Sequence, residues 1–410
     1  MRISPCFIRR LRRSWRFSEA NEMNAPEVEP ESGTNEEGDL ASAASSGTED
    51  VTRRSAFLYL VGPATLKGTL AFAEPPSLWN SALAGLQASL VIVIALPLFW
   101  LSSFSHLIGY AALGALPALF GRFHSGAGRR RVVAQCGFWQ TASILGMSSL
   151  VCLGVGPEGL LLALALACGV LYFVASTIRP GPPGALIFIF AAGAAMANAP
   201  TWEVVLERGA ATAAVSVLSW LVCVVTERLR ERATPERSFP MEPQRSLQDR
   251  LQVSARVAVG AAFAVFAVHA FGASHPEWAA MGAVAVMQGV HLTVSMHRAI
   301  QRMVGTLIGA LIVWMILSND PNVWLIIACV AVFQFLTEVV IGYNYAIGQI
   351  VITPMALLMS YLASPLGSVS ANIAVERVLD TVIGATIGLL FAVITSSLAD
   401  RRSLLERGGR

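Results

Sequence analysis

Long apolar runs, separated by short polar loops, constrain this chain more than any other feature. A helix needs about 20 apolar residues to cross the hydrocarbon core of a bilayer, and the 410-residue sequence offers twelve runs of that kind. Soluble globular proteins have about 25% charged residues, whereas this chain has 13%. The sequence therefore predicts an all-α, polytopic integral membrane protein whose main partner is the lipid bilayer.

The apolar runs fall into two sets of six, and they divide the chain into membrane and non-membrane parts. We expect a first six-helix repeat over 81–226, a cytoplasmic linker over 227–250, a second six-helix repeat over 251–398 and a cytoplasmic tail over 399–410. The twelve spans are expected at 82–101, 105–121, 133–154, 157–177, 184–199, 204–226, 252–272, 276–294, 300–317, 321–341, 344–363 and 374–397.

The N-terminal region differs in composition from the rest of the chain. Residues 1–17 are rich in arginine, and residues 18–52 are acidic and rich in Ser, Gly, Ala and Pro. Such a composition predicts a disordered tail over 1–54. The next segment, 55–80, contains Gly62-Pro63 and Lys67, which indicates an interfacial position. Either Met1 or Met23 could be the true start.

The arginines predict the orientation of the spans. With a cytoplasmic N-terminus, Arg122, Arg129–Arg131 and Arg179 fall in cytoplasmic loops, together with the linker and both termini. The loops expected outside, such as "SSFS" and "GVGPEG", have no Lys or Arg. This is the positive-inside pattern of inner membrane proteins, so both termini are expected in the cytoplasm.

The two halves also resemble each other in sequence. A shift of 168 residues places "YAALGA" (110–115) on "WAAMGA" (278–283), and a shift of 169 places Glu207-Arg208 on Glu376-Arg377. Because each half has an even number of spans, such repeats would run parallel, related by an axis along the membrane normal.

Two predicted helices carry small residues on one face. Gly305 and Gly309 are one helical turn apart, as are Gly384 and Gly388. Helices in lipid pack closely through small residues with this spacing, so we expect helix packing at all four glycines. Arg302 stands just before the first pair, where it would either snorkel to the interface or bind a substrate carboxylate.

The span "NYAIGQIVITPMALLMSYL" (344–362) is the strongest candidate for a substrate site. Pro354 removes one backbone donor, and freed backbone at membrane depth is tolerated where protein or a water-filled cavity satisfies it. The corresponding first-half span is short and carries Gly193. Paired interrupted spans indicate a transporter's binding site, although an ordinary proline kink would look the same. The predicted substrate-binding set is Arg302, Thr306, Tyr345, Gln349, Thr353, Pro354 and Trp278.

Ionisable residues inside membrane spans are candidates for proton coupling. Glu338 and Asp380 are the two carboxylates that we select for this role. Asp380 lies three residues after Arg377, so a local ion pair is the alternative. Trp278 could stack on an aromatic substrate or belong to the interfacial aromatic belt.

The second half resembles a known family of membrane proteins. The runs "SHPEWAAMGAVAVMQG", "RAIQRMVGTLIGALI", "NYAIGQIVITPMALLM" and "ERVLDTVIGATIG" occur in order within 250–397 and resemble the fusaric acid resistance-like (FUSC) family of the aromatic acid exporter group. Plant aluminium-activated malate transporters are more distant relatives. The resemblance implies efflux of small organic, above all aromatic, acids across the bacterial cell membrane.

The sequence departs from the family in two ways and lacks enzyme motifs. Only 227–250 separates the halves, where many members carry a large cytoplasmic domain, and the first half has "CGFWQTAS" (136–143) in place of the glycine run. No P-loop, H-E-x-x-H or G-x-S-x-G motif is present. We therefore expect no enzyme, no cofactor, no metal and no nucleic-acid partner.

Three functions remain open at this point: an exporter of organic anions, a dimeric anion channel with Arg256, Arg298, Arg302 and Arg377 along its pore, and a membrane scaffold that transports nothing. A homo-oligomer and a periplasmic partner are both compatible with the sequence.

Overall fold

The computed structural model describes residues 52–60, 72, 75–234, 239, 244–289, 291–363, 372–398, 400–401 and 404. Most of the segments predicted as a disordered tail (1–54), an interfacial segment (55–80) and a C-terminal tail (399–410) lie outside these residues. Helix α3 (Arg53–Leu60) is the described element of that first region. Its Ala56 and Leu60 are buried in a cluster with Leu292 and Leu389 from α13 and α16.

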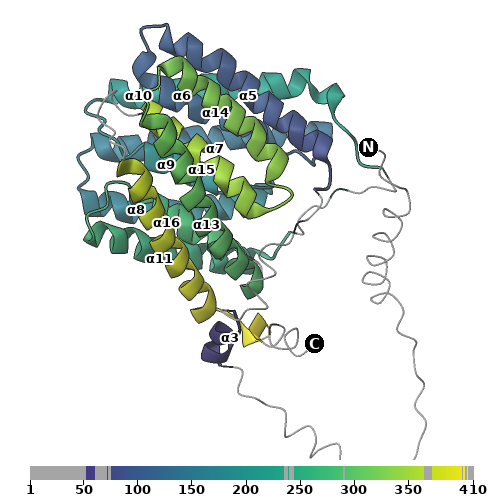
Figure 1. Cartoon of the computed structure of the whole chain (residues 1–410), viewed down its shortest axis with the longest axis vertical. Helices are drawn as coiled ribbons and strands as arrows, with labels where there is room; N and C mark the ends of the chain where they lie inside the picture. The colour runs from purple at the N-terminus through teal and green to yellow at the C-terminus, as the bar shows by residue number, and fades with distance from the viewer. Residues whose placement is uncertain are drawn as a thin grey trace, which may run out of the picture. The chain divides into compact units, whose positions relative to one another are not determined.

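Every element of the described residues is helical (Figure 1). The all-α prediction is confirmed for this part of the chain. The first half contains α5 (Leu78–Trp100), η1 (Ser105–Leu107), α6 (Ile108–Ala115), η2 (Leu116–Leu119), α7 (Gly126–Cys152), α8 (Pro157–Ile178), α9 (Leu186–Ala194), α10 (Trp202–Val225) and η3 (Glu227–Leu229). The second half contains α11 (Leu247–Ala270), α12 (Glu277–Met287), α13 (Leu292–Leu317), α14 (Val323–Val340), α15 (Tyr345–Ala363) and α16 (Asn372–Ile394).

Several long helices begin at a residue that caps them. The side chains of Ser77, Ser246 and Asn322 accept a hydrogen bond from the backbone N–H three residues later, at 3.1, 3.1 and 2.8 Å. Each of these bonds satisfies one of the N–H groups that a helix leaves without a partner at its first turn. The polar loop residues thus fix where α5, α11 and α14 start.

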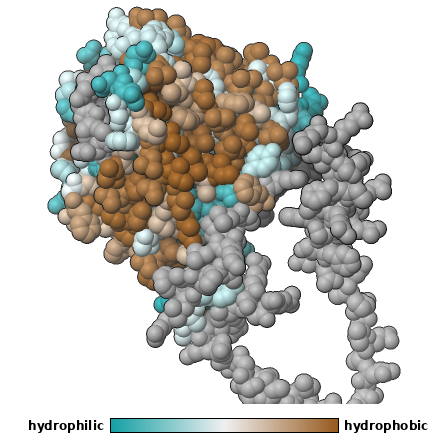
Figure 2. Space-filling view, viewed as in Figure 1, coloured by the Kyte–Doolittle hydropathy of each residue, from teal (hydrophilic) through white to brown (hydrophobic). Residues whose placement is uncertain are grey.

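Eight of the helices in the described residues are long and apolar enough to cross a membrane. They are α5, α8, α10, α11, α13, α14, α15 and α16. Helix α7 has 27 residues but is less apolar, with serine, threonine and glutamine along its length. Figure 2 shows that the visible face of the helical part is covered largely by apolar side chains, and large apolar residues such as Leu98, Phe263 and Leu311 are exposed.

Three of the twelve expected spans are shorter than predicted. The spans expected at 105–121, 184–199 and 276–294 contain the short helices α6, α9 and α12, and α12 has only 11 residues. Local sequence explains the breaks, because Pro117 lies in η2 and the segment Pro180–Gly184 precedes α9. All residues of α6 and α12 are buried, so these helices contact protein on every side, where irregular backbone at their ends can be satisfied.

The helices of the two halves pack in matching pairs. Helix α6 packs on α10 and α12 packs on α16, while α9 packs on α7 and α15 packs on α13. Contacts between the halves match too, since α14 lies against α5 and α11 lies against α8 (Figure 1). The last helix of each half therefore covers the short second helix of the same half.

Glycine allows α13 and α16 to approach their neighbours closely. A Cβ atom on Gly305 or Gly309 would lie 2.7 or 2.8 Å from a backbone oxygen of α15. On α16, a Cβ atom on Gly384 or Gly388 would lie 2.2 or 2.7 Å from a backbone oxygen of α12. These contacts leave no space for a side chain at any of the four positions.

One end of the helical bundle collects the basic loops. Arg230, after η3, donates to the carbonyl of His124, and Arg250, at the start of α11, donates to the hydroxyl of Thr177. The opposite end holds 101–104, 153–156, 271–276 and 318–322, which carry no Lys or Arg. The two ends of the bundle therefore differ in charge, and the positive-inside rule relates such a difference to orientation in a membrane.

Candidate functional site

A cavity of about 450 Å³ lies between the two halves of the chain and is lined by both. It extends from the loop segment Arg179–Gly184 and the residues before α11 to side chains of α12, α13, α15 and α16. Its lining includes one carboxylate, Glu338, and seven arginines, namely Arg122, Arg179, Arg245, Arg250, Arg298, Arg302 and Arg377. The site is therefore strongly cationic, which favours anions.

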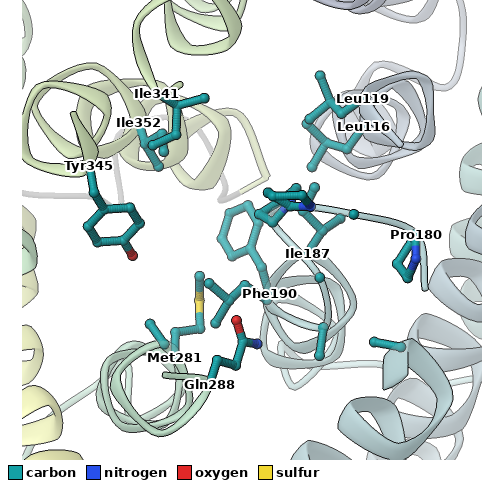
Figure 3. Close-up of a pocket in the computed structure, with 18 of the residues that line it drawn as sticks. Leu116, Leu119, Pro180, Ile187, Phe190, Met281, Gln288, Ile341, Tyr345 and Ile352 are labelled. Atoms are coloured by element: carbon teal, nitrogen blue, oxygen red, sulfur yellow. The ribbon is translucent and has the colours of Figure 1, made fainter. Parts of the chain in front are cut away.

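The wall between these cations is apolar. Figure 3 shows Phe190, Ile187 and Met281 extending into the cavity, while Tyr345, on another wall, points its hydroxyl toward the same space. The other apolar lining residues that the figure labels are Leu116, Leu119, Pro180, Ile341 and Ile352. A cavity with apolar walls and a few convergent polar groups is typical of a small-molecule site, and here those polar groups are mainly guanidinium groups.

Arg302 lies inside the protein and does not snorkel to the membrane interface. Its side chain is about 2% exposed and lines the cavity. One of its terminal nitrogens, Nη1, donates to the hydroxyl of Tyr345 at 3.2 Å, whereas Nε has no hydrogen-bond partner. Arg302, Tyr345 and Gln349, three of the predicted substrate-binding residues, thus line one cavity.

Arg377 also lines the cavity and is even more deeply buried, at about 1% exposure. Its guanidinium lies 5.0 Å from the ring centre of Trp278, which is a cation–π contact. The Nε and Nη1 atoms of Arg377 have no hydrogen-bond partner. Trp278 does not itself line the cavity. Its ring contacts Arg377 and the ring of His275.

Glu338 forms an ion pair with Arg122, and both side chains are buried. Arg122 follows η2 in the first half and Glu338 belongs to α14 in the second, so the pair connects the two halves at the cavity wall. A second contact, from Arg122 to the carbonyl of Pro182, is long at 3.5 Å. The pair leaves the cavity without a free carboxylate among its lining residues.

The other predicted residues lie outside the cavity. Thr306, Thr353 and Pro354 are buried between α13 and α15, and Asp380 is buried between α16 and its neighbours, but none of the four lines the cavity. Helix α15 continues through Pro354, so the interruption that we expected there is absent. Ile352, Met355 and Ala356 face the cavity instead.

A local ion pair between Arg377 and Asp380, the alternative to a coupling role for Asp380, is absent from the described contacts. Asp380 Oδ2 and two nitrogens of Arg377 have no partner. A cluster of titratable groups lies nearby, where His275 contacts Glu277 at 3.3 Å and Glu376 accepts the backbone N–H of His275 at 3.0 Å. Burial lowers the pKa of His275, but its hydrogen bond with Glu277 and the surrounding carboxylates outweigh this, so the pKa lies above 6.5.

Sequence reasoning missed Arg122, Arg179, Arg245 and Arg250 as cavity residues. In the sequence all four look like ordinary basic residues of cytoplasmic loops, because nothing local distinguishes a buried arginine from a solvated one. In the part of the chain that the structure describes, no group of three or more His, Cys, Asp or Glu side chains is placed to hold a metal ion.

The fold and the cavity define a class, which is a multi-pass α-helical membrane protein with a cationic internal site. Comparison with known families then places the second half. Residues 262–391 match the family described as fusaric acid resistance protein-like, and this confirms the resemblance seen in the motifs of that segment. The match begins within α11 and ends within α16, so it includes Arg302, Glu338 and Arg377.

A curated relative is also a membrane protein. The chain is 37% identical over 121 residues to YvaC of Bacillus subtilis (strain 168), a membrane protein described as uncharacterized. The alignment covers 30% of this chain and 19% of the relative, so the chain spans only a small part of that protein's length. No solved structure matches the chain.

Proposed function

We propose that this protein is a secondary transporter that exports small organic acids, aromatic acids among them, across the bacterial cytoplasmic membrane. The observation that carries the proposal is the charge of the cavity, which is lined by seven arginines and one carboxylate. That carboxylate, Glu338, is paired with Arg122. Guanidinium groups match carboxylates in geometry and charge, and the apolar walls suit a hydrocarbon body. The family match supports a role in transport and not in enzymatic catalysis.

The orientation follows from the positive-inside rule. The cavity reaches the end of the bundle where the basic loops lie, and positive loops face the cytoplasm. In this proposal the structure therefore has its cavity open to the cytoplasm, where an exporter would load its substrate.

We also propose that the two halves are parallel six-helix repeats. The matching helix pairs support this, since α6 packs on α10 as α12 packs on α16, and α5 contacts α14 as α11 contacts α8. An axis along the membrane normal would relate the halves. The cavity, lined by both, would then open and close by movement of one repeat against the other.

Glu338 is the residue that we propose for proton coupling. As a carboxylate it pairs with Arg122 across the two halves in the structure that would load substrate, and a proton on Glu338 would remove this attraction and let the halves move apart. Proton and substrate would thus occupy the protein in alternate states, as the exchange of an inward proton for an outward anion requires. Asp380 stays a second candidate, although it lies outside the cavity lining.

The test is transport of radiolabelled aromatic and aliphatic acids into proteoliposomes that contain the purified protein, with and without an imposed pH gradient. An exporter coupled to protons should show flux that the gradient accelerates, and Glu338→Gln should remove that acceleration. Flux that does not depend on the pH gradient, together with unitary currents, would instead identify an anion channel. Liposomes without protein give the background leak of each acid, and flux no faster than that background would reject transport.

A further inference from the structure

Two arginines occupy equivalent places in the two halves. Arg208 of α10 lies over the ring of Tyr110 on α6, and Arg377 of α16 lies over the ring of Trp278 on α12, both at 5.0 Å from the ring centre. The sequence shift that aligns "YAALGA" with "WAAMGA" also aligns the two aromatic residues, and a shift one residue longer aligns the two arginines. The chain therefore contains the same aromatic–arginine contact twice.

The two arginines differ in what their nitrogens contact. Nη1 of Arg208 donates to the carbonyl of Ala197 at 2.9 Å and to the hydroxyl of Ser148 at 3.3 Å, and Nη2 donates to the carbonyl of Asn198. Arg377 has unpartnered Nε and Nη1 atoms. Arg208 does not line the cavity, whereas Arg377 does. Arg208 binds the backbone after α9, whereas Arg377 lines the cavity and has two donors that no protein group accepts.

Arg302 completes the arrangement around Arg377. Both side chains are at least 98% buried, both line the same cavity, and the positive charge of Arg302 repels that of Arg377. Glu277 and Asp380 attract Arg377, but neither of them lines the cavity. Two buried like charges that both carry unpartnered donors are costly unless an anion lies between them.

We propose that Arg302 and Arg377 together form the site that binds the carboxylate of the substrate. The hydroxyl of Tyr345, which already contacts Arg302, and the amide of Gln349 lie beside the same space. The apolar body of the ligand would lie against Met281, Ile352 and Phe190. The ligand class is therefore a monocarboxylate with an apolar ring or chain, and this assignment rests on the proposed transport function.

The test measures binding, so it does not depend on transport. Full-length protein in detergent is titrated with benzoate, with its uncharged analogue benzamide as the comparison, and thermal stabilisation reports affinity. The wild-type protein should prefer benzoate, and Arg377→Gln should weaken benzoate binding by about tenfold or more with little effect on benzamide. Arg377→Lys, which keeps the charge but loses the planar fork, should give intermediate affinity.

Arg208→Gln is the matched control, because Arg208 is the buried arginine that makes the equivalent aromatic contact in the first half and does not line the cavity. It should bind benzoate like the wild-type protein. Replacing a purely structural arginine removes its hydrogen bonds and should lower the melting temperature of the protein without ligand. Arg377→Gln should instead melt at the wild-type temperature or above it, because the substitution removes a buried charge that has no hydrogen-bond partner.

The outcomes separate this proposal from the transport function. Benzoate binding that depends on Arg377, in a protein that carries no flux, would support the site and reject the transporter. Benzoate flux and binding that Arg377→Gln leaves unchanged would support the transporter and reject the site. Equal loss of benzoate binding in Arg377→Gln and Arg208→Gln, or a wild-type protein that does not bind benzoate, would also overturn the proposal.

Discussion

Arg208 and Arg377 show how the two halves of one fold have come to differ in use. Both lie over an aromatic ring of the short second helix of their half. In the first half the arginine donates to Ala197, Asn198 and Ser148, and in the second half two nitrogens of the arginine have no hydrogen-bond partner. The arginine of the first half is thus held by hydrogen bonds, and the arginine of the second half is the one that we propose for ligand binding.

The helix pairs that carry these arginines also differ in the size of the residues at their contact. Gly384 of α16 aligns with Val215 of α10, so the second half has glycine where the first has a branched side chain. Both α6 and α12 contribute a glycine of their own, Gly114 and Gly282, to the contact. Small residues on both partners allow close approach, and Arg377 is carried by the pair that has glycine on both helices at the contact.

The largest effect is expected from filling that contact. In Gly384→Ala the new methyl group would lie 2.2 Å from the carbonyl oxygen of Ala279, so the helix backbones must separate, at a cost of about 3 kcal/mol. Gly146→Ala is the control, because nothing lies within 4 Å of that position, and it should gain up to about 1 kcal/mol in helix propensity. Thermal unfolding of both variants in the same detergent measures the difference; equal stabilities would mean that α12 and α16 are not packed this closely.

A somewhat smaller loss should follow Arg208→Gln. Shortening this side chain leaves the carbonyls of Ala197 and Asn198 without their donor, which costs about 2 kcal/mol. Arg377→Gln breaks no hydrogen bond and should not lower the melting temperature. The comparison fails if Arg377→Gln destabilises the protein as much as Arg208→Gln does, because Arg377 would then be structural as well.

The sequence predicted the helices better than it predicted the cavity. Each of the twelve expected runs contains a helix, since hydrophobicity over about 20 residues is a local property. The glycine faces at Gly305 and Gly384 also lie against neighbouring helices. The short lengths of α9 and α12 were harder to predict from the sequence, because a helix buried in protein is as apolar as one that crosses lipid. The partners of Arg122 and Arg377 depend on contacts across more than 90 residues, which local patterns do not encode.

The contact between the halves can be tested through its ion pair. Arg122 and Glu338 are both buried, so a double-mutant cycle with Arg122→Gln and Glu338→Gln should give a coupling free energy of about 1.5 kcal/mol. Thermal unfolding of the two single variants and the double variant supplies the cycle. Additive changes in the free energy of unfolding would show that Arg122 and Glu338 are not coupled. They would also reject the role that we propose for this pair in proton coupling.

The smallest effect concerns the loop before α12, where His275 stacks on Trp278 with ring centres 4.5 Å apart. Because Glu277, Glu376 and Asp380 keep the pKa of His275 above 6.5, the folded protein binds this proton more tightly than the unfolded chain does. The resulting stability is complete below about pH 6.5 and is lost as pH rises through the higher folded pKa. His275→Gln should therefore lower the melting temperature at about pH 5.5 and have less effect at about pH 8.5. His106 pairs with Glu207 at the corresponding place in the first half but is more exposed, so His106→Gln should change the melting temperature less at either pH. If His275→Gln and His106→Gln respond alike, the loop that precedes Trp278 is held no more tightly than its counterpart, and the two halves do not differ at this loop.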